Sequence, residues 1–490
     1  MARRPNLILF NPDQWRGDVL GHMGNKAAVT PNLDERVRRD SVSFGRAFCQ
    51  NPVCTPSRCS FMTGWYPHVR GHRTMHHMLS RDEPMLLRRL KEAGYFVWWG
   101  GKNDVVPAEN GFDEYCDVKY RPPIKPSANT NYHANTAWRG TKDSDTYYSF
   151  YVGRADENLD EDYYDGDWAN VRGAIDFIAS STGQDQPFCL YLPLLYPHPP
   201  YAVEEPWFSR IHRADLPDRA KLDVWEGKPS ILRGIFERQR MGSWTEERWD
   251  ELRATYYGMC ARVDAQFGLI VEALQQANLY DDTAIFVFSD HGDFTGDYGL
   301  VEKTQNTFED CLTRVPLVIK PPSNVVVKPR VTDALVELLD ISATIEEWAE
   351  LPPTHTHFGR TLVPVLSGET EEHRDAVFCE GGRLHGEDHC AEKQSINESP
   401  DSLYWPRLSL QQSEGPEHTK AVMCRTKEYK YVKRLYEADE LYDLTLDPLE
   451  LVNRIDDENY SRIREELSSR LVRFYLETSD VVPFAANRRE

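Results

Sequence analysis

Long apolar runs are missing from this chain. The longest, around residues 188–196, falls far short of the roughly 20 apolar residues that a transmembrane helix needs. The basic opening stretch MARRPNLILFNP contains only the apolar run Leu7–Phe10, which is shorter than the hydrophobic segment of a secretory signal peptide. These features predict a cytoplasmic protein without a membrane partner.

The chain also has few basic residues relative to acidic ones, and few cysteines for its length. Lys and Arg number 57 against 78 Asp and Glu, and the resulting net charge of −21 argues against a broad nucleic-acid-binding surface. A local cationic pocket within such a surface can still bind a small anion. Ten cysteines in 490 residues, without a targeting segment, indicate reduced thiols rather than a disulfide framework.

Apolar runs rich in β-branched and aromatic residues alternate with helical patterns along most of the chain. This alternation predicts an α/β fold with a central, mostly parallel mixed sheet between layers of helices. From about residue 376 the segments AVMCRT, YKYVKRLY and DDENYSRIREELSSRLVRFYLE are typical of a small α+β unit. We therefore expect a large domain over 1–375 and a smaller C-terminal α+β domain with an antiparallel sheet over 376–490.

Four of the apolar runs lead directly into polar residues. The runs and the residues that follow them are 6–10 with Asp13 and Gln14, 95–99 with Lys102 and Asp104, 187–197 with His198, and 283–288 with Ser289, Asp290 and His291. Singly, such residues usually cap helices or lie in solvent. Ligands of open α/β sheets bind beyond the carboxyl ends of the strands, so four cases together favour one site.

The residue types after two of these runs suit a metal ion. Asp13, Gln14 and Asp290 offer oxygen donors, and His291 adds a nitrogen. Oxygen-rich donors favour Ca²⁺ or Mg²⁺, while the amide and the imidazole leave Mn²⁺ and Zn²⁺ open. No Cys–His spacing of the zinc-finger type accompanies them.

The stretch CQNPVCTPSRCSFMTG (49–64) has several interpretations. Cys49, Cys54 and Cys59 are spaced C-x4-C-x4-C, but iron–sulfur sites use other spacings and a fourth nearby cysteine. Cys54 as a thiol nucleophile needs a neighbouring imidazole or cation, and Arg58 is a candidate for lowering its pKa. A buried cysteine that acts only as a small apolar side chain is the commonest case.

The same stretch resembles the signature of the type I sulfatases. That signature is C-x-P-S-R followed by an apolar pair and T-G, which corresponds to Cys54 through Gly64. SDHGDFTGDYGLVEK (289–303) is similar to the second signature of the family, and GGKND, PHPPY and ELYDLTLDPLELVN (440–453) resemble further motifs. The resemblance covers residues 5 to about 453, nearly the whole chain.

The resemblance implies a cofactor, a partner and a set of roles. Cys54 would be oxidised to Cα-formylglycine by a formylglycine-generating enzyme, and one divalent cation, with Ca²⁺ as first choice, would be bound beside it. The implied substrate is a small-molecule or carbohydrate sulfate ester. The implied metal ligands are Asp13, Gln14, Asp290 and His291, and the implied catalytic residues are Cys54, Arg58, Lys102, His198 and Lys303.

Two positions depart from the usual family pattern. Gln14 stands where most members have a second Asp, and this Asp-Gln form resembles choline sulfatases and phosphonate monoester hydrolases. Asp104 stands where many members have His, so we count it as a catalytic candidate. Its carboxylate could act as a base, bind a cationic or hydroxyl-bearing part of the substrate, or repel a dianion.

Two long segments of low periodicity, 118–167 and 383–420, are expected to shape the pocket. The run GHRTMHHML (71–79) adds His72, His76 and His77 as candidate substrate contacts, and residues 380–389 are a further candidate. These residues suit a sugar sulfate and an aryl sulfate equally.

Two other functions stay open at this point. One is a phosphonate monoester or phosphodiester hydrolase with the same fold and the same modified cysteine, which Gln14 favours and Lys102 does not. The other is a non-catalytic metal-binding protein in which Cys54 is never converted. A homo-oligomer is compatible with either function.

Overall fold

The computed structural model describes residues 4–123, 136–155, 165–392, 399–412, 414–484 and 486. Within these ranges the central sheet has nine strands in the order β11-β2-β10-β8-β1-β6-β3-β4, with β9 paired to β2. Their bounds are β1 (Asn6–Asn11), β2 (Val42–Phe48), β3 (Phe96–Trp99), β4 (Val118–Lys119), β6 (Phe188–Pro193), β8 (Thr283–Phe288), β9 (Arg314–Val315), β10 (Leu317–Lys320) and β11 (Arg330–Glu337). Only β9 and β10 run antiparallel to their neighbours, so the predicted mostly parallel mixed sheet is confirmed.

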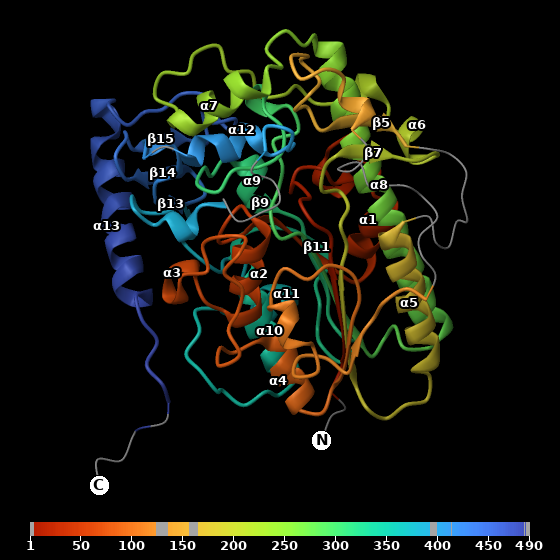
Figure 1. Ribbon diagram of the computed structural model, residues 1–490. Coiled ribbons are helices and arrows are strands. Elements are labelled where there is room, and N and C mark those ends of the chain that lie inside the picture. Colours follow the sequence, from red (N-terminus) through yellow and green to blue (C-terminus); the bar gives the residue numbers. More distant parts are fainter. Residues whose placement is uncertain are drawn as a thin grey trace.

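Helices cover both faces of this sheet (Figure 1). Leu7 and Leu9 of β1 belong to a core shared with α2 (Cys54–Thr63), α4 (Leu86–Glu92) and α10 (Asp340–Trp348). Ile8 and Phe10 belong to the core on the other face, with α1 (Pro31–Arg39), α5 (Gly166–Ser180) and α8 (Glu246–Gln276). Successive side chains of a strand point to opposite faces, and each buried Leu, Ile or Phe stabilises the fold by about 1.5–3 kcal/mol.

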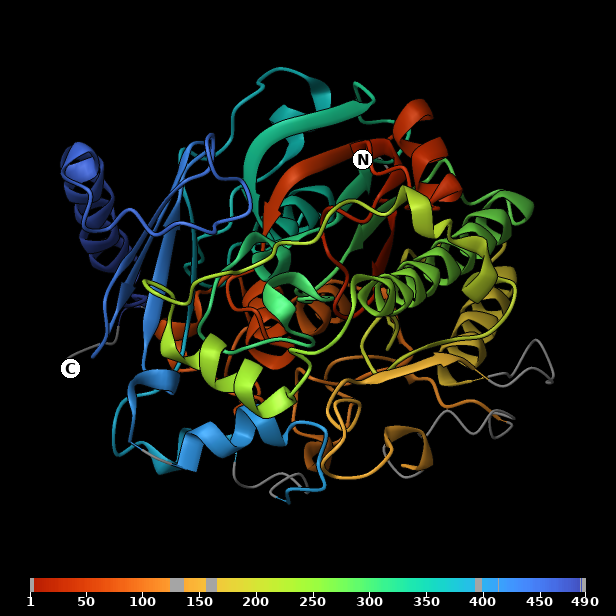
Figure 2. The same ribbon diagram turned by 90° about the horizontal axis from the view of Figure 1, so that it is seen from above.

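The C-terminal part of the chain forms a separate antiparallel sheet. Its strands are β12 (Val377–Gly381), β13 (Ala421–Arg425), β14 (Tyr429–Arg434) and β15 (Glu440–Asp443). Helix α13 (Ser461–Thr478) packs on its outer face (Figure 2). The rings of Phe378 and Phe474 stack there with centroids 4.1 Å apart. The predicted α+β architecture is thus present, and the domain boundary at residue 376 stays a prediction.

This small sheet lies close to the large domain. A Cβ atom added at Gly381 would lie only 1.8 Å from the backbone oxygen of Gln305, so the end of β12 touches the loop that follows Lys303. Asn51 Nδ2 also donates to the carbonyl of Glu380 at 2.7 Å. The C-terminal segment therefore contacts the segments on either side of the candidate site.

The remaining elements are short. They are β5 (Tyr151–Arg154) and β7 (Tyr201–Val203), which pair in parallel, and α3 (Pro67–Arg70), α6 (Trp207–Arg210), α7 (Ser230–Gln239), α9 (Asp310–Thr313), α11 (Val363–Ser367) and α12 (Trp405–Leu408). Parts of the two predicted long segments, residues 124–135, 156–164, 393–398 and 413, lie outside the described residues. No helix among the described residues combines the length and apolar composition needed to span a membrane.

Candidate active site

The four strands that carry polar residues at their ends are neighbours in the sheet. β8, β1, β6 and β3 lie side by side in this order and run parallel to one another. Their carboxyl ends therefore meet at one edge, as the sequence pattern predicts. The loops after β1 and β8 deliver Asp13, Asp290 and His291, and the loop after β3 delivers Lys102.

Four ligand-type side chains converge at this edge. Ligand atoms of Asp13, Cys54, Asp290 and His291 all lie within 4.8 Å of one another, and all four residues are buried. Cys54 Sγ lies 3.2 Å from His291 Nε2 and 3.6 Å from Asp13 Oδ1. His291 Nδ1 lies 2.9 Å from the carbonyl oxygen of Gly292, to which it donates, so Nε2 presents its lone pair to the cluster.

Cys54 is the first residue of helix α2. Val53 before it is extended, with φ −134° and ψ 147°, and Pro56 occupies the first turn, where its missing N–H costs no helical hydrogen bond. The helix ends at Gly64, whose φ of 72° suits glycine. The unpaired N–H groups of the first turn carry partial positive charge, which favours an anion beside Cys54.

Arg58 holds the two carboxylates of the cluster together. Its side chain is completely buried, Nη2 lies 2.9 Å from Asp13 Oδ2, and Nε lies 2.8 Å from Asp290 Oδ2. Burial by itself would raise the pKa of Asp13, but Lys102 and Arg58 hold that pKa well below its usual range. The guanidinium therefore contacts both carboxylates and, with Lys102, keeps Asp13 ionised.

The thiol of Cys54 is not activated by this arrangement. Burial, with the Asp13 carboxylate beside it, raises the pKa of Cys54 to about 12. A thiol with this pKa is protonated at neutral pH and is a poor nucleophile. The idea that Arg58 lowers the pKa of Cys54 is not supported, because the guanidinium is engaged by the two carboxylates.

Lys102 lies on the other side of Asp13. Its Nζ donates to Asp13 Oδ2, lies 2.7 Å from Asp104 Oδ2, and lies 3.6 Å from Cys54 Sγ. Gly101 before it has φ +74°, and its backbone packs so closely on Pro193 that no side chain fits. Asp104 thus forms an ion pair with Lys102 at the cavity wall.

Lys303, His198 and Gln14 form a hydrogen-bonded chain next to the cluster. Lys303 Nζ donates to Gln14 Oε1 at 2.8 Å and to His198 Nε2 at 3.0 Å. His198 Nδ1 donates to the carbonyl of Pro199 at 2.6 Å, so Nε2 is the acceptor of this chain. Gln14 has φ 69°, and its Nε2 donates to Asp293 Oδ2.

Asp293, within the Gly- and Asp-rich loop after β8, is also part of this arrangement. It is fully buried, and it accepts from Gln14 and, at 2.7 Å, from the Tyr201 hydroxyl. Burial raises the pKa of Asp293 to about 6. The one sequence signal that could have indicated it is its place inside the second signature.

Of the three candidate histidines after helix α2, one lines the main cavity and two do not. His76 lines the cavity described below. His72 instead pairs with Glu83 at 3.0 Å, and His77 accepts from or donates to Thr74 at 2.6 Å and faces His389. The structure does not bring His72 or His77 to the lining of that cavity.

A cavity of about 1030 Å³ opens over the cluster. Its lining includes Cys54, Lys102, Asp104, His198 and Lys303. The two segments expected to shape the pocket also contribute, 118–167 with Lys119 and Asp167, and 383–420 with Glu392, Tyr404 and Arg407. Glu302, directly before Lys303, is a further lining residue. The volume is that of a small-molecule site.

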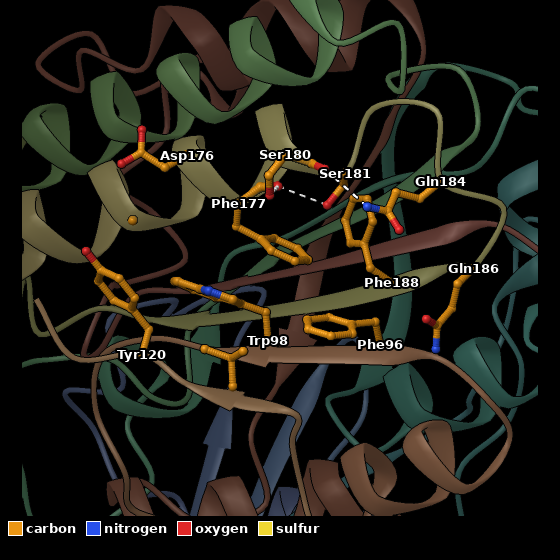
Figure 3. A pocket seen from close by; sticks show the side chains of 12 residues that line it. Phe96, Trp98, Tyr120, Asp176, Phe177, Ser180, Ser181, Gln184, Gln186 and Phe188 are labelled. Atoms are coloured by element: carbon orange, nitrogen blue, oxygen red, sulfur yellow. Dashed lines mark hydrogen bonds between the residues drawn. The ribbon is translucent and has the colours of Figure 1, made fainter.

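A second cavity of about 420 Å³ lies along β3 and helix α5 (Figure 3). Aromatic rings dominate it, and Phe177 stacks on Phe96 and Trp98 with centroids 5.7 and 5.9 Å apart. Tyr120 lines both cavities and packs on Gly173, where any side chain would collide with its ring. The aromatic rings that line this second cavity account for its shape. Cys54 lines the larger cavity instead.

Comparisons with known proteins agree with this geometry. The family model described as Sulfatase matches residues 5–351. Arylsulfatase K of Gallus gallus is 26% identical over 479 residues, covering 92% of this chain and 79% of its own. PehA of Trinickia caryophylli, a multifunctional alkaline phosphatase superfamily protein, is 24% identical, with 97% and 96% covered.

Among solved structures, the phosphonate monoester hydrolase of Agrobacterium radiobacter has the same fold, with a TM-score of 0.74 at 24% identity and coverage of 97% and 96%. The match to the family model extends over well more than half of the chain. The chain belongs to the sulfatase family, whose members are sulfuric ester hydrolases of the alkaline phosphatase superfamily.

Proposed function

We propose that this protein hydrolyses a sulfate ester to an alcohol and inorganic sulfate, using a nucleophile made from Cys54 and a bound divalent cation. The observation that carries the proposal is the convergence of Asp13, Cys54, Asp290 and His291 within 4.8 Å at the N-terminus of helix α2. Cys54 at the start of helix α2 lines one cavity together with Lys102 and Lys303, and this arrangement of positive groups suits a bound sulfate ester.

The donor set fits a divalent cation. Asp13 and Asp290 provide carboxylate oxygens, His291 provides Nε2, and Arg58 contacts both carboxylates. When bound, the cation would supply positive charge that favours an ionised nucleophile and neutralises sulfate oxygens. Gln14 stays a predicted fourth ligand, with its side-chain oxygen now accepting from Lys303, and Ca²⁺ stays the first choice.

Residue 54 fits the modification as well. Conversion by a formylglycine-generating enzyme would give a hydrated aldehyde with two hydroxyls on one carbon, one to attack sulfur and one whose deprotonation releases sulfate. Serine in this place lacks the second hydroxyl. The helix N-terminus and Lys102, 3.6 Å from Cys54 Sγ, attract negative charge at this position and oppose the burial and the Asp13 carboxylate that keep the unmodified thiol protonated.

The remaining residues have roles that follow from their contacts. Lys102 and Lys303 bind sulfate oxygens, and the ion pair with Asp104 orients Lys102. Lys303 Nζ donates to His198 Nε2, so a proton is held between them at the place of the departing alcohol oxygen. Breaking the sulfur–oxygen bond leaves an alkoxide that takes up this proton, and the lysine is recharged from solvent.

Sulfate release from 4-nitrophenyl sulfate tests the proposal. Protein produced together with a formylglycine-generating enzyme should release nitrophenol and sulfate in equal amounts. Cys54→Ala should lower kcat by roughly 10³-fold or more, and Cys54→Ser should stop after at most one turnover per molecule. Cys390→Ser, which changes a half-buried cysteine outside the cluster, is the matched control and should keep full activity. Wild-type activity in both Cys54 variants would refute the proposal.

A second candidate is a phosphonate monoester or phosphodiester hydrolase, which Gln14 favours. The amide in place of a carboxylate makes the ligand set less negative, which suits a more highly charged transition state. Turnover of a phenylphosphonate monoester by the same preparation decides between the two. We expect kcat/KM to be higher for the aryl sulfate, and the reverse order would replace the first proposal by the second.

A further inference from the structure

Glu302, directly before Lys303, is held in an unfavourable position at the cavity wall. Its side chain is buried, with the residue only 3% exposed, and its φ is +70°, in the left-handed region that non-glycine residues avoid. Its carboxylate oxygen Oε1 lies 3.4 Å from Lys303 Nζ, and Oε2 lies 3.5 Å from Arg407 Nε. Strain of this kind is retained where the surrounding structure needs the side chain in one place.

Arg407 reaches the same wall from the C-terminal segment. It belongs to helix α12 and is 6% exposed, and its Nη1 donates to both oxygens of Glu392 at 2.8 and 2.9 Å. Glu392 is fixed in turn because its backbone N–H donates to Gln411 Oε1 at 2.8 Å. The guanidinium is therefore anchored by one end, and its Nε edge faces Glu302.

Two polar atoms between these side chains lack a hydrogen bond. Within the described part of the chain, Glu302 Oε1 and Arg407 Nε are buried and have no hydrogen-bond partner. A buried polar atom left without a hydrogen bond is destabilising, because the loss of its contacts with water is not compensated. Both residues line the cavity that contains Cys54, so a bound molecule can supply the missing partner.

We propose that Glu302 and Arg407 recognise a hydroxyl group on the alcohol part of the substrate, next to the esterified oxygen. This inference rests on the proposed sulfatase function and adds the chemical class of the leaving alcohol. The hydroxyl hydrogen is donated to Glu302 Oε1, and the hydroxyl oxygen accepts from Arg407 Nε. A vicinal diol monosulfate, in a polyol or sugar ring or in a catechol, has this arrangement.

The distances agree with a neighbouring hydroxyl. Lys303 Nζ lies 3.0 Å from His198 Nε2, the pair that handles the ester oxygen, and 3.4 Å from Glu302 Oε1. The ester oxygen and the recognised hydroxyl are therefore served by adjacent groups. An anionic substituent in the same place would meet the carboxylates of Glu302 and Glu392, so a second sulfate or a carboxylate is disfavoured there.

Three chromogenic esters test this inference. 2-Hydroxy-4-nitrophenyl sulfate, whose hydroxyl is ortho to the ester and meta to the nitro group and so stays mostly protonated at neutral pH, is compared with 2-methoxy-4-nitrophenyl sulfate and with 4-nitrophenyl sulfate. The methoxy compound keeps an oxygen substituent at the same ring position and has similar ring electronics. It differs from the hydroxyl compound in that it cannot donate a hydrogen bond. We expect kcat/KM for the hydroxyl compound to exceed that of the methoxy compound by roughly 10- to 100-fold, the range for hydrogen bonds to charged groups.

Substitutions test whether Glu302 and Arg407 cause the preference for the hydroxyl compound. Glu302→Gln and Arg407→Lys should each bring the hydroxyl-to-methoxy ratio to within about threefold of one, because each removes one charge-assisted hydrogen bond. Glu251→Gln is the control. It removes the ion pair between Glu251, on helix α8, and Arg213, and it should leave the ratio unchanged.

The outcomes are distinct. Turnover of all three esters by the wild type with a ratio near one overturns this inference and leaves the sulfatase function standing. No turnover of any ester by protein whose residue 54 is formylglycine by mass spectrometry refutes the proposed function, and this inference with it. If a variant does not fold, the wild-type ratio still decides.

Discussion

At the scale of single residues, the charge balance of the cluster depends on Arg58. Two carboxylates, Asp13 and Asp290, share one fully buried guanidinium, and no solvent reaches them. Paired buried charges of this kind contribute little net stability, but removal of one partner leaves the others unpaired. The cluster is therefore sensitive to this one side chain.

Arg58→Met is expected to lower the free energy of unfolding by about 3–5 kcal/mol, because Asp290 then loses its guanidinium and Asp13 keeps only Lys102 as a cationic partner. Urea denaturation of the chelator-treated protein measures the loss, and an added divalent cation should restore part of it. Arg38→Met, on the exposed face of α1 with the side chain 72% exposed, should change stability by no more than about 0.5 kcal/mol. Equal effects of the two substitutions would contradict the role given to Arg58.

At the scale of elements, the ends of strands β3 and β6 fix the position of Lys102. The N–H of Lys102 donates to the carbonyl of Pro193 at 3.0 Å, and a Cβ atom at Gly101 would lie 2.1 Å from that carbonyl oxygen. The two strand ends thus approach so closely that only glycine fits between them.

Gly101→Ala tests this close approach. The collision should displace the loop, lower kcat by roughly 10²-fold through misplacement of Lys102, and destabilise the protein by more than strain alone. Gly24→Ala is the matched control, since Gly24 has φ +88° and a Cβ atom there would meet no other atom within 4 Å, so only about 1–2 kcal/mol of backbone strain applies. Thermal unfolding and steady-state kinetics of both variants measure the difference, and full activity of Gly101→Ala would contradict the account.

The positions of the central strands could be predicted from the sequence. Strands β1, β3, β6 and β8 occur where apolar runs predict them, because runs of Leu, Ile, Val and Phe that are buried on both faces have little alternative to a central strand. The polar residues after them meet because parallel neighbours end at one edge. Helix α2 begins at Cys54, as the proline and the polar first turn indicate.

The rest of the site depends on contacts between distant segments. Gln14 forms a hydrogen bond with Asp293, which lies 279 residues further along the chain. Glu302 likewise forms an ion pair with the distant Arg407. Neither periodicity nor strand-end position shows which loops lie together. The sequence therefore does not single out Asp293 or Glu302, and for Arg407 it indicates only the segment 383–420. His72 and His77 illustrate the opposite case, since a run of histidines in one loop turns only His76 toward the cavity.

At the scale of the whole molecule, the cavity is assembled from both parts of the chain. The large sheet provides the cluster, and the segment before β13 provides Glu392, Tyr404 and Arg407. β12 is packed against the loop after Lys303, so the C-terminal sheet and the catalytic loop have fixed relative positions. In the proposed mechanism the large domain provides the chemistry, and leaving-group selection is shared between Glu302 beside Lys303 and Arg407 of the C-terminal segment.

The central claim is that a cation and a modified residue 54 occupy the same edge of the large sheet. A crystal structure of the protein, produced with a formylglycine-generating enzyme and loaded with Ca²⁺, tests it most directly. The account predicts density for a hydrated aldehyde at residue 54 and one cation bonded to it, to Asp13, to Asp290 and to His291. An unmodified cysteine after such maturation, or a cation bound away from these residues, would contradict it.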